Sequence, residues 1–332
     1  MFRGIVADSR KATHPRHRIC ELVPPFMTLN ELKYIVAVAR ERHFGRAAEA
    51  CFISQPTLSV AVKKLEEELG VTVFERRKGE VSVTAIGEQV VSQALRVLEE
   101  AGGIKQIADQ GQGQLASPLR IGAIYTIGPY LLPRLIPDLA ERAPQMQLVV
   151  EESYTSVLTE KLKRGDLDVI LISYPFEEPG IRTLPLYREP FVLLLPSSHP
   201  FNQKQKVKVA ELSKEDVLLL GSGHCFRDQV LEMCPECLHR STDDRPGKML
   251  EGGSLETIRY MVASGLGVTV LPCTAAGAER FSERLLEVRR FAGKTPSRVV
   301  ALAWRKSFPR PEAINAIREA VLDSLPGCVK PV

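Results

Sequence analysis

The sequence lacks any apolar run of the roughly 18 residues needed to cross a membrane. Its most apolar stretches, Phe191–Leu195 and Val217–Leu220, have the length of buried strands. Residues 1–26 contain no apolar segment of the kind found in secretion signals. We therefore expect a cytoplasmic protein that is neither embedded in a membrane nor exported. The length of 332 residues predicts two or three domains.

The sequence also has little net charge. The formal charge is +4, and residues 1–26, with five Lys/Arg and two Asp/Glu, supply +3 of it. Because the patterned sequence begins at Met27, we expect residues 1–26 to form an N-terminal extension without regular structure. The remaining chain is nearly neutral, so any argument for a nucleic-acid partner depends on where the basic residues lie.

The sequence lacks the cysteine framework of a small secreted domain, because its seven cysteines are odd in number and widely scattered. We expect Cys51, Cys273 and Cys328 to be inert in a reducing cytosol. Cys234-Pro235-Glu236-Cys237 has the spacing of a redox pair or of half a zinc site, but the second pair that a zinc site usually needs does not exist. No cofactor fingerprint is present either, so we expect neither a metal nor a cofactor.

Residues 27–85 have the pattern of a winged helix-turn-helix. Apolar residues recur at helical spacing from Leu29 to Arg42, and Gly45–Cys51 predicts a short second helix. Ser54 is a suitable N-cap for a third helix that ends at Gly70. Two short strand-like runs follow, with a basic hairpin tip between them.

The placement of polar and basic residues favours DNA over a plain helical bundle, although residues 28–85 carry nine Lys/Arg against eight Asp/Glu. The start of the third helix is small and polar, which suits the edges of bases, and the basic residues suit phosphates. The candidate DNA-binding residues are Gln55, Pro56, Thr57, Ser59, Lys63, Arg76 and Arg77, with Lys64 and Lys78 beside them.

A linker helix is predicted over residues 86–112. Val90, Val97 and Ile104 form one heptad series, and three alanines form the alternate series. A helix packed only on its own domain is the alternative, but a heptad seam that leaves a DNA-binding head favours dimerisation. We expect Gly102-Gly103 to interrupt the helix. The Gly-rich residues 110–118 predict the domain boundary.

Residues 118–325 alternate between predicted strands and helices, which indicates parallel sheets covered by helices. We expect two α/β lobes, one of residues 118–190 and 298–325 and the other of residues 191–297. The chain then crosses between the lobes near Pro190 and near Ser297. A cleft between such lobes is a suitable ligand site.

This order of domains resembles the LysR-type transcriptional regulators over nearly all of residues 27–325. The motifs that carry the resemblance are Phe44-Gly45-Arg46-Ala47-Ala48, Ser54-Gln55-Pro56-Thr57-Leu58-Ser59 and Leu69-Gly70. The resemblance implies a periplasmic-binding-protein-like regulatory domain, binding to double-stranded promoter DNA, and homodimers that pair into tetramers. It also implies contact with RNA polymerase.

The segment Gly223-His224-Cys225-Phe226-Arg227-Asp228-Gln229, followed by Cys234, resembles the OxyR-like, peroxide-sensing branch of that family. Ser254-Leu255-Glu256-Thr257 and Arg298 match as well. In that branch hydrogen peroxide oxidises the first cysteine, the second closes a disulfide with it, and a thiol reductant resets the pair. The resemblance offers Thr126, His224 and Arg227 as peroxide-binding residues, with Asp228 to orient them. Met249 stands where some members carry a histidine.

The surroundings of Cys225 also favour a reactive thiolate on physical grounds. It precedes a predicted helix start, and Arg227 and His224 lie beside it in the sequence. If Cys225 and Cys234 share one helix, their Cα atoms lie roughly 13–14 Å apart. A disulfide tolerates about 7 Å, so the helix must unwind before the two can bond.

We thus predict an activator of oxidative-stress genes that senses peroxide through Cys225 and Cys234, and not an enzyme. Two alternatives stay open. One is a regulator that binds a small organic effector between the lobes, and the other is a thiol peroxidase or disulfide reductase. Cys237 is a potential competitor of Cys225 for Cys234.

Overall fold

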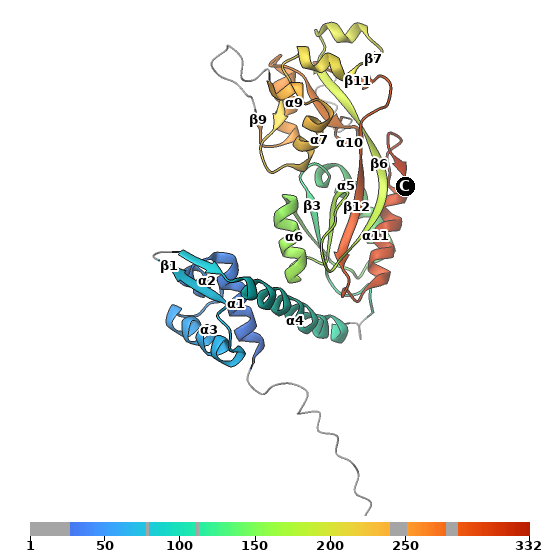
Figure 1. Ribbon diagram of the computed structural model, residues 1–332. Helices are drawn as coiled ribbons and strands as arrows, with labels where there is room; N and C mark the ends of the chain where they lie inside the picture. Colours follow the sequence, from blue (N-terminus) through green and yellow to red (C-terminus); the bar gives the residue numbers. More distant parts are fainter. Residues whose placement is uncertain (1–26, 78–79, 110–112, 240–250, 277–284) are drawn as a thin grey trace, which may run out of the picture. The chain divides into compact units, whose positions relative to one another are not determined.

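The computed structural model describes residues 27–77, 80–109, 113–239, 251–276 and 285–332 (Figure 1). The predicted extension 1–26 and position 249 lie outside the described residues. The chain forms two compact units, residues 1–98 and 99–332.

The first unit begins with three helices, α1 (Leu29–Glu41), α2 (Phe44–Ala50) and α3 (Gln55–Leu69). The predicted caps of α3 are confirmed: Ser54 accepts a hydrogen bond from the Thr57 N–H, and Gly70 ends the helix at φ +66°. The helices enclose a core to which Ile35, Ala47, Leu58, Val62 and Leu65 contribute fully buried side chains.

The wing follows as an antiparallel hairpin of β1 (Phe74–Arg77) and β2 (Glu80–Val83). The next helix, α4 (Ala85–Asp109), is continuous through Gly102-Gly103, so the predicted interruption is wrong. No neighbouring group approaches either glycine within the described residues. The first half of the heptad seam packs on the head through Ala94, whereas Ile104 is 69% exposed.

The second unit begins with a parallel β–α–β series. Strands β3 (Leu119–Ile124), β4 (Leu148–Ser153) and β5 (Val169–Tyr174) lie in the order β4-β3-β5. Helices α5 (Gly128–Arg142) and α6 (Thr155–Arg164) connect them, and α11 (Pro311–Asp323) packs beside α5 (Figure 1). These elements enclose the first hydrophobic core of the unit.

A single strand of 16 residues, β6 (Ile181–Pro196), contributes to both cores. Residues 181–190 pair with β12 (Ser297–Arg305), and residues 191–196 pair with β10 (Thr269–Pro272) and β11 (Leu286–Phe291). Strand β6 changes its pairing partners where Pro190 pairs with Ser297. These are the two positions at which the sequence predicts that the chain crosses between the lobes. Because β12 and β6 are antiparallel to their neighbours, the sheet is mixed and not purely parallel as predicted.

The remaining elements surround the second core. Two short strands, β8 (Leu219–Leu220) and β9 (Glu251–Gly252), pair in parallel beside α7 (Cys225–Met233), α8 (Glu236–His239) and α9 (Leu255–Ala263). The short strand β7 (Lys206–Val207) pairs with β11, and α10 (Cys273–Ala276) follows β10. Near its end the chain returns to β6 through β13 (Lys330–Pro331). The predicted fold class is confirmed.

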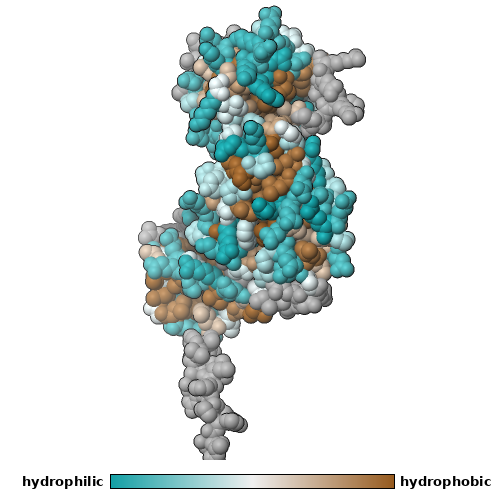
Figure 2. Space-filling model, turned by 90° about the vertical axis from the view of Figure 1, so that its right-hand side faces the viewer, coloured by the Kyte–Doolittle hydropathy of each residue, from teal (hydrophilic) through white to brown (hydrophobic). Residues whose placement is uncertain are grey.

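The surface of the molecule is mostly hydrophilic on the face shown in Figure 2, with apolar residues gathered in patches. Among the described residues, no helix is both long enough and apolar enough to span a bilayer.

Candidate functional site

The predicted DNA-reading residues lie at the exposed start of α3. Gln55, Pro56 and Thr57 are exposed, and Ser59 is half-buried. The Thr57 hydroxyl shares a hydrogen bond of 2.7 Å with the Ser54 hydroxyl, so the N-cap holds one of the candidate side chains. The amide of Gln55, which is exposed, and the hydroxyl of the half-buried Ser59 are both suited to read base edges.

The basic residues of the head differ in their availability to phosphates. Lys63 is exposed and makes only a weak pair, 3.5 Å from Glu67. Lys64 is hydrogen-bonded to Glu31 and Glu68, and these contacts raise the pKa of its ammonium group. Arg76 and Arg77 end strand β1, opposite Val81 and Glu80, and their side chains lie outside the described part of the structure.

Cys225 is the first residue of α7 and carries a free thiol. It is half-buried and packs against the first core, whereas Phe226 and Val230 are buried in the second core. The start of α7 thus joins the two cores. Cys234 follows the last turn and donates its backbone N–H to the Val230 carbonyl at 3.0 Å. The two cysteines therefore lie at opposite ends of one helix, as predicted.

His224, the residue before the thiol, is buried against two tyrosines. Its ring lies 4.8 Å from that of Tyr154 and 5.8 Å from that of Tyr125, which are themselves in edge contact. Burial lowers the pKa of His224, although a hydrogen bond with the backbone of Gly253 opposes this shift. The imidazole is therefore neutral at pH 7 and does not supply the positive charge expected beside Cys225. Its Nε2 atom is buried without a hydrogen-bond partner among the described residues.

Arg227 and Asp228 have different surroundings. Arg227 donates to the Leu220 carbonyl at 2.6 Å and pairs with Glu251 at 2.7 Å, so it joins α7 to β8 and β9. Asp228 is exposed, and within the described part of the chain its carboxylate has no hydrogen bond or ion pair.

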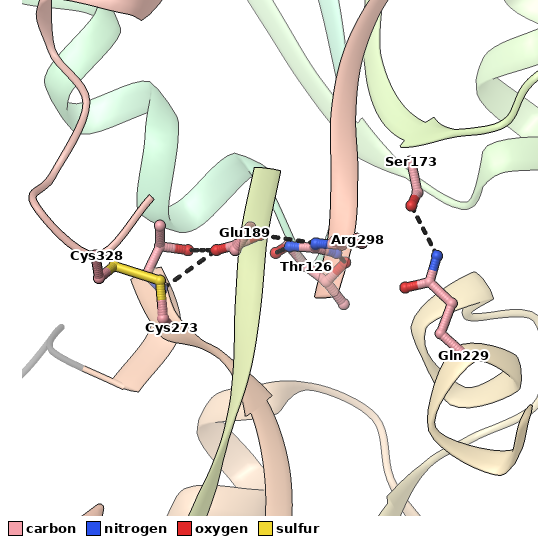
Figure 3. A network of polar contacts seen from close by, with 8 residues as sticks. Thr126, Ser173, Glu189, Gln229, Cys273, Arg298 and Cys328 are labelled. Atoms are coloured by element: carbon pink, nitrogen blue, oxygen red, sulfur yellow. Dashed lines mark hydrogen bonds and ion pairs between the residues drawn. A yellow bond between two sulfur atoms is a disulfide. The ribbon is translucent and has the colours of Figure 1, made fainter. Parts of the chain in front are cut away.

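Thr126 is held by a buried ion pair that Figure 3 shows from close by. Arg298 donates from Nη1 to the Thr126 hydroxyl at 2.8 Å and from Nη2 to the Thr126 carbonyl at 2.7 Å. Its Nε donates to Glu189 at 2.7 Å, and the other oxygen of Glu189 accepts from Thr274. Glu189 was not predicted, although an acidic residue two positions before the apolar run Phe191–Leu195 is a signal of a buried partner.

The fixed group around Thr126 also contacts α7. The Arg298 guanidinium lies 5.4 Å from the centroid of the Phe226 ring, which in turn packs edge-on against Phe191 at 5.0 Å. Farther along the helix, the Gln229 amide donates to the Ser173 hydroxyl of β5 at 2.7 Å (Figure 3). Helix α7 is thus attached to the first core at two points.

Two pairs of cysteines are bonded. Cys234 is bonded to Cys237, and Cys273 to Cys328, with Cα–Cα distances of 5.6 Å and 6.3 Å. The expectation that Cys273 and Cys328 are inert core residues is therefore wrong. The chain returns to β6 through β13 near its end, which brings the two cysteines together although they are 55 residues apart. No cluster of three potential metal ligands exists in the residues that the structure describes.

The arrangement is suited to one kind of chemistry. A half-buried thiol lies next to a neutral histidine whose Nε2 has no partner among the described residues, and a fixed threonine hydroxyl belongs to the same unit. A thiolate can attack a peroxide oxygen, and a neighbouring hydrogen-bonding group can assist the departure of hydroxide.

Comparison with known proteins agrees with this geometry. The family described as bacterial regulatory helix-turn-helix protein, lysR family, matches residues 29–88, and the LysR substrate binding domain matches residues 112–326. The DNA-binding transcriptional dual regulator OxyR of Escherichia coli K12 is 36% identical over 301 residues, which cover 91% of this chain and 97% of that protein.

Solved structures give the same result. Full-length OxyR of Pseudomonas aeruginosa, solved as a cysteine-to-aspartate variant, is 52% identical, with a TM-score of 0.67 over 89% of this chain and 94% of that one. A reduced form of OxyR from N. meningitidis is 45% identical, with a TM-score of 0.61 over 65% of this chain and 99% of that one. The chain therefore belongs to the LysR family of bacterial regulators and, within it, to the OxyR group of hydrogen peroxide-inducible genes activators.

Proposed function

We propose that this protein is a cytoplasmic transcription regulator that detects hydrogen peroxide by oxidation of Cys225 and then forms a Cys225–Cys234 disulfide. The observation that carries the proposal is the placement of these two cysteines at the two ends of α7. Nine residues at about 1.5 Å each separate their Cα atoms by roughly 13–14 Å, whereas a disulfide tolerates about 7 Å. A bond between them requires α7 to unwind.

The first step is attack of the Cys225 thiolate on peroxide, which leaves a sulfenic acid and releases hydroxide. His224 is suited to accept a hydrogen bond from the bound peroxide, because burial keeps the ring neutral and its Nε2 has no partner among the described residues. Thr126 is suited to hold the peroxide, because Arg298 fixes both its hydroxyl and its carbonyl. We assign Arg227 and Asp228 a role in holding and orienting the start of α7 around the thiol.

The second step converts a chemical change into a structural one. Phe226 and Val230 are each 2% exposed, and burial of such side chains contributes about 1.5–3 kcal/mol apiece. Unwinding α7 removes them from the second core and removes Phe226 from Arg298. Formation of the disulfide offsets this loss, so reduced and oxidised proteins have two distinct folds in this region.

The output is altered binding to promoter DNA by an oligomer. We assign residues 27–85 to DNA binding, 86–112 to the linker and 118–325 to regulation. Self-association is supported by the edge strand β4, where Val149 and Val150 are 47% and 38% exposed, because an uncovered apolar edge favours pairing with another chain. The altered oligomer then contacts RNA polymerase, and a thiol reductant resets it.

The test uses the full-length protein and a pool of random-sequence DNA duplexes, from which the reduced protein selects its sites. The bound sites are then footprinted with reduced protein and again after one equivalent of hydrogen peroxide. We expect the protected positions to shift upon oxidation, and we expect no shift with Cys225→Ser or Cys234→Ser. The proposal is wrong if the wild-type footprint is unchanged while Cys225 has been oxidised.

A turnover assay distinguishes a regulator from a thiol peroxidase. With excess peroxide and a dithiol reductant, a sensor is oxidised once and then waits for slow reduction. Sustained consumption of peroxide at the rate of the first oxidation would instead indicate an enzyme.

A further inference from the structure

Cys234 is already bonded to a cysteine other than its predicted partner. We propose that Cys237 is a third redox residue that takes Cys234 away from Cys225, so that the peroxide response switches itself off. This inference rests on the proposed function, because it concerns the fate of the Cys225–Cys234 disulfide.

The first observation is the local geometry of the Cys234–Cys237 pair. The two Cα atoms lie 5.6 Å apart, in the usual range for a disulfide, and the Cys237 N–H donates to the Cys234 carbonyl at 3.1 Å. Cys234 directly follows α7, and Cys237 is the second residue of α8. Because only two residues lie between the cysteines, bringing them together costs little conformational entropy.

The second observation is that this bond leaves α7 intact. With Cys234 bonded to Cys237, residues Cys225–Met233 form a regular helix, and Phe226 and Val230 keep their places in the second core. The Cys225–Cys234 bond requires the same helix to unwind. Transfer of the disulfide from the first pair to the second therefore lets α7 refold, which favours the transfer.

The third observation is burial. Cys234 is 1% exposed and Cys237 is 8% exposed, both within the second core, whereas Cys225 is half-buried and free. Dissolved peroxide therefore reaches Cys225 more easily than it reaches the pair. Oxidation enters at Cys225 and reaches the buried pair through the unwound helix.

The proposed steps balance. The Cys225 thiolate and hydrogen peroxide give a sulfenic acid and hydroxide, and the Cys234 thiol condenses with the sulfenic acid to give the Cys225–Cys234 disulfide and water. The Cys237 thiolate then attacks the Cys234 sulfur, the Cys234–Cys237 bond forms, and Cys225 leaves as a thiolate. One peroxide has been reduced by two thiols, and Cys225 is restored.

The final state is refractory. Cys225 can form a sulfenic acid again, but it has no thiol with which to condense until a dithiol reductant opens the Cys234–Cys237 bond. The rate at which that buried bond is reduced, and not the loss of peroxide, then sets when the protein can respond a second time.

The test begins with full-length protein that has been fully reduced and freed of reductant. One equivalent of hydrogen peroxide is added, and samples are alkylated at intervals and mapped without reduction. Trypsin cleaves after Arg227 and a glutamate-specific protease cleaves after Glu236, so each disulfide joins two separate peptides. The variants are Cys237→Ser, Cys237→Ala as a second replacement of the same thiol, and Cys225→Ser.

In the wild type we expect Cys225–Cys234 to appear first and then to convert into Cys234–Cys237, with Cys225 again open to alkylation. In both Cys237 variants we expect Cys225–Cys234 to persist for at least about tenfold longer, because the attacking thiol is gone. In Cys225→Ser we expect Cys234–Cys237 to form at least about tenfold more slowly than in the wild type.

Two results would overturn the inference while leaving the proposed function in place: equal lifetimes of Cys225–Cys234 with and without Cys237, or equally fast Cys234–Cys237 formation without Cys225. A Cys225 that stays a free thiol in the Cys237 variants would instead overturn the proposed function itself, and the inference with it.

Discussion

The two sides of the candidate peroxide site are built differently. Thr126 is fixed by Arg298 and Glu189, whose side chains are 1% and 0% exposed and lie 2.7 Å apart. Cys225 lies at the start of a nine-residue helix whose preceding residue, His224, has a buried ring nitrogen without a partner in the described structure. One side is held by charge-assisted hydrogen bonds and the other mainly by apolar packing.

This difference indicates how a chemical signal becomes a structural one. A binding group works best when it is held in place, whereas a reactive group that must reach a second thiol needs a segment that can unfold locally. Helix α7 is held by the packing of Phe226 and Val230 and by the hydrogen bond from Gln229. Arg227 adds contacts with the Leu220 carbonyl and Glu251, and these must also be lost or rearranged when the helix unwinds. The Thr126 side is expected to stay unchanged when α7 unwinds.

The largest effect is expected from removing the reactive thiol. Cys225→Ser should nearly abolish peroxide consumption by the reduced protein, because a serine hydroxyl supplies no thiolate to attack the peroxide. The measurement is stopped-flow loss of one equivalent of peroxide. The matched control is Cys51→Ser, which removes the other free cysteine of the described residues and should leave the rate unchanged. A large loss in the control alone would contradict the account.

The next largest effect concerns the fixed side. Arg298→Ala leaves the fully buried Glu189 without its cation and should lower the free energy of unfolding by about 3–5 kcal/mol. Denaturant unfolding of the reduced protein measures this. Arg298→Lys is the matched control, because it keeps the charge but cannot hold both Thr126 and Glu189. Its free energy of unfolding should lie between those of the wild type and Arg298→Ala. A loss below 1 kcal/mol in Arg298→Ala would show that this side is not fixed by the ion pair.

A smaller effect is expected where α7 is attached to β5. Ser173→Ala removes the partner of Gln229 without changing the sequence of the helix, and it should weaken the attachment by about 1 kcal/mol. Formation of Cys225–Cys234 in the Cys237→Ser background should then be about fivefold faster. Ser222→Ala, at an exposed position, is the control. A slower reaction in Ser173→Ala would contradict the proposed unwinding.

The smallest effect is a pH dependence of stability at the start of α7. Burial lowers the pKa of His224 in the folded protein, so below the unfolded pKa of about 6.5 the unfolded chain binds a proton more readily. The free energy of unfolding should therefore fall as pH drops from about 6.5 toward the folded pKa of His224. His224→Gln should lose this part of the dependence, which denaturant titrations at several pH values can measure. An identical pH dependence in both proteins would show that His224 is not buried as described.

The sequence predicts the head more completely than the regulatory site, for a physical reason. In the head the signals are local: Ser54 caps α3, Gly70 ends it, and the structure confirms both. The group around Thr126 instead joins residues 63 and 109 positions apart, Glu189 to Thr126 and to Arg298, and no local pattern links such residues. The same holds for Cys273 and Cys328, which meet only because the end of the chain returns to β6.

Helix α7 could be predicted from the sequence only in part. Its position, its two cysteines and its apolar face follow from local sequence, and the structure confirms the helix. The neutrality of His224 and the engagement of Arg227 by Glu251 did not follow, because both depend on residues that the fold brings from elsewhere. The Cys234–Cys237 bond is local, and the Cys-x-x-Cys spacing was a sufficient signal for it.

The central claim is that the Cys225–Cys234 disulfide forms only with loss of α7. Backbone hydrogen exchange tests it most directly, with Cys237→Ser protein compared before and after one equivalent of peroxide. We predict that the amides of residues 229–234, including the Cys234 N–H bonded to Val230, lose their protection upon oxidation, whereas those of β3 keep theirs. A formed Cys225–Cys234 bond with α7 still fully protected would contradict the account.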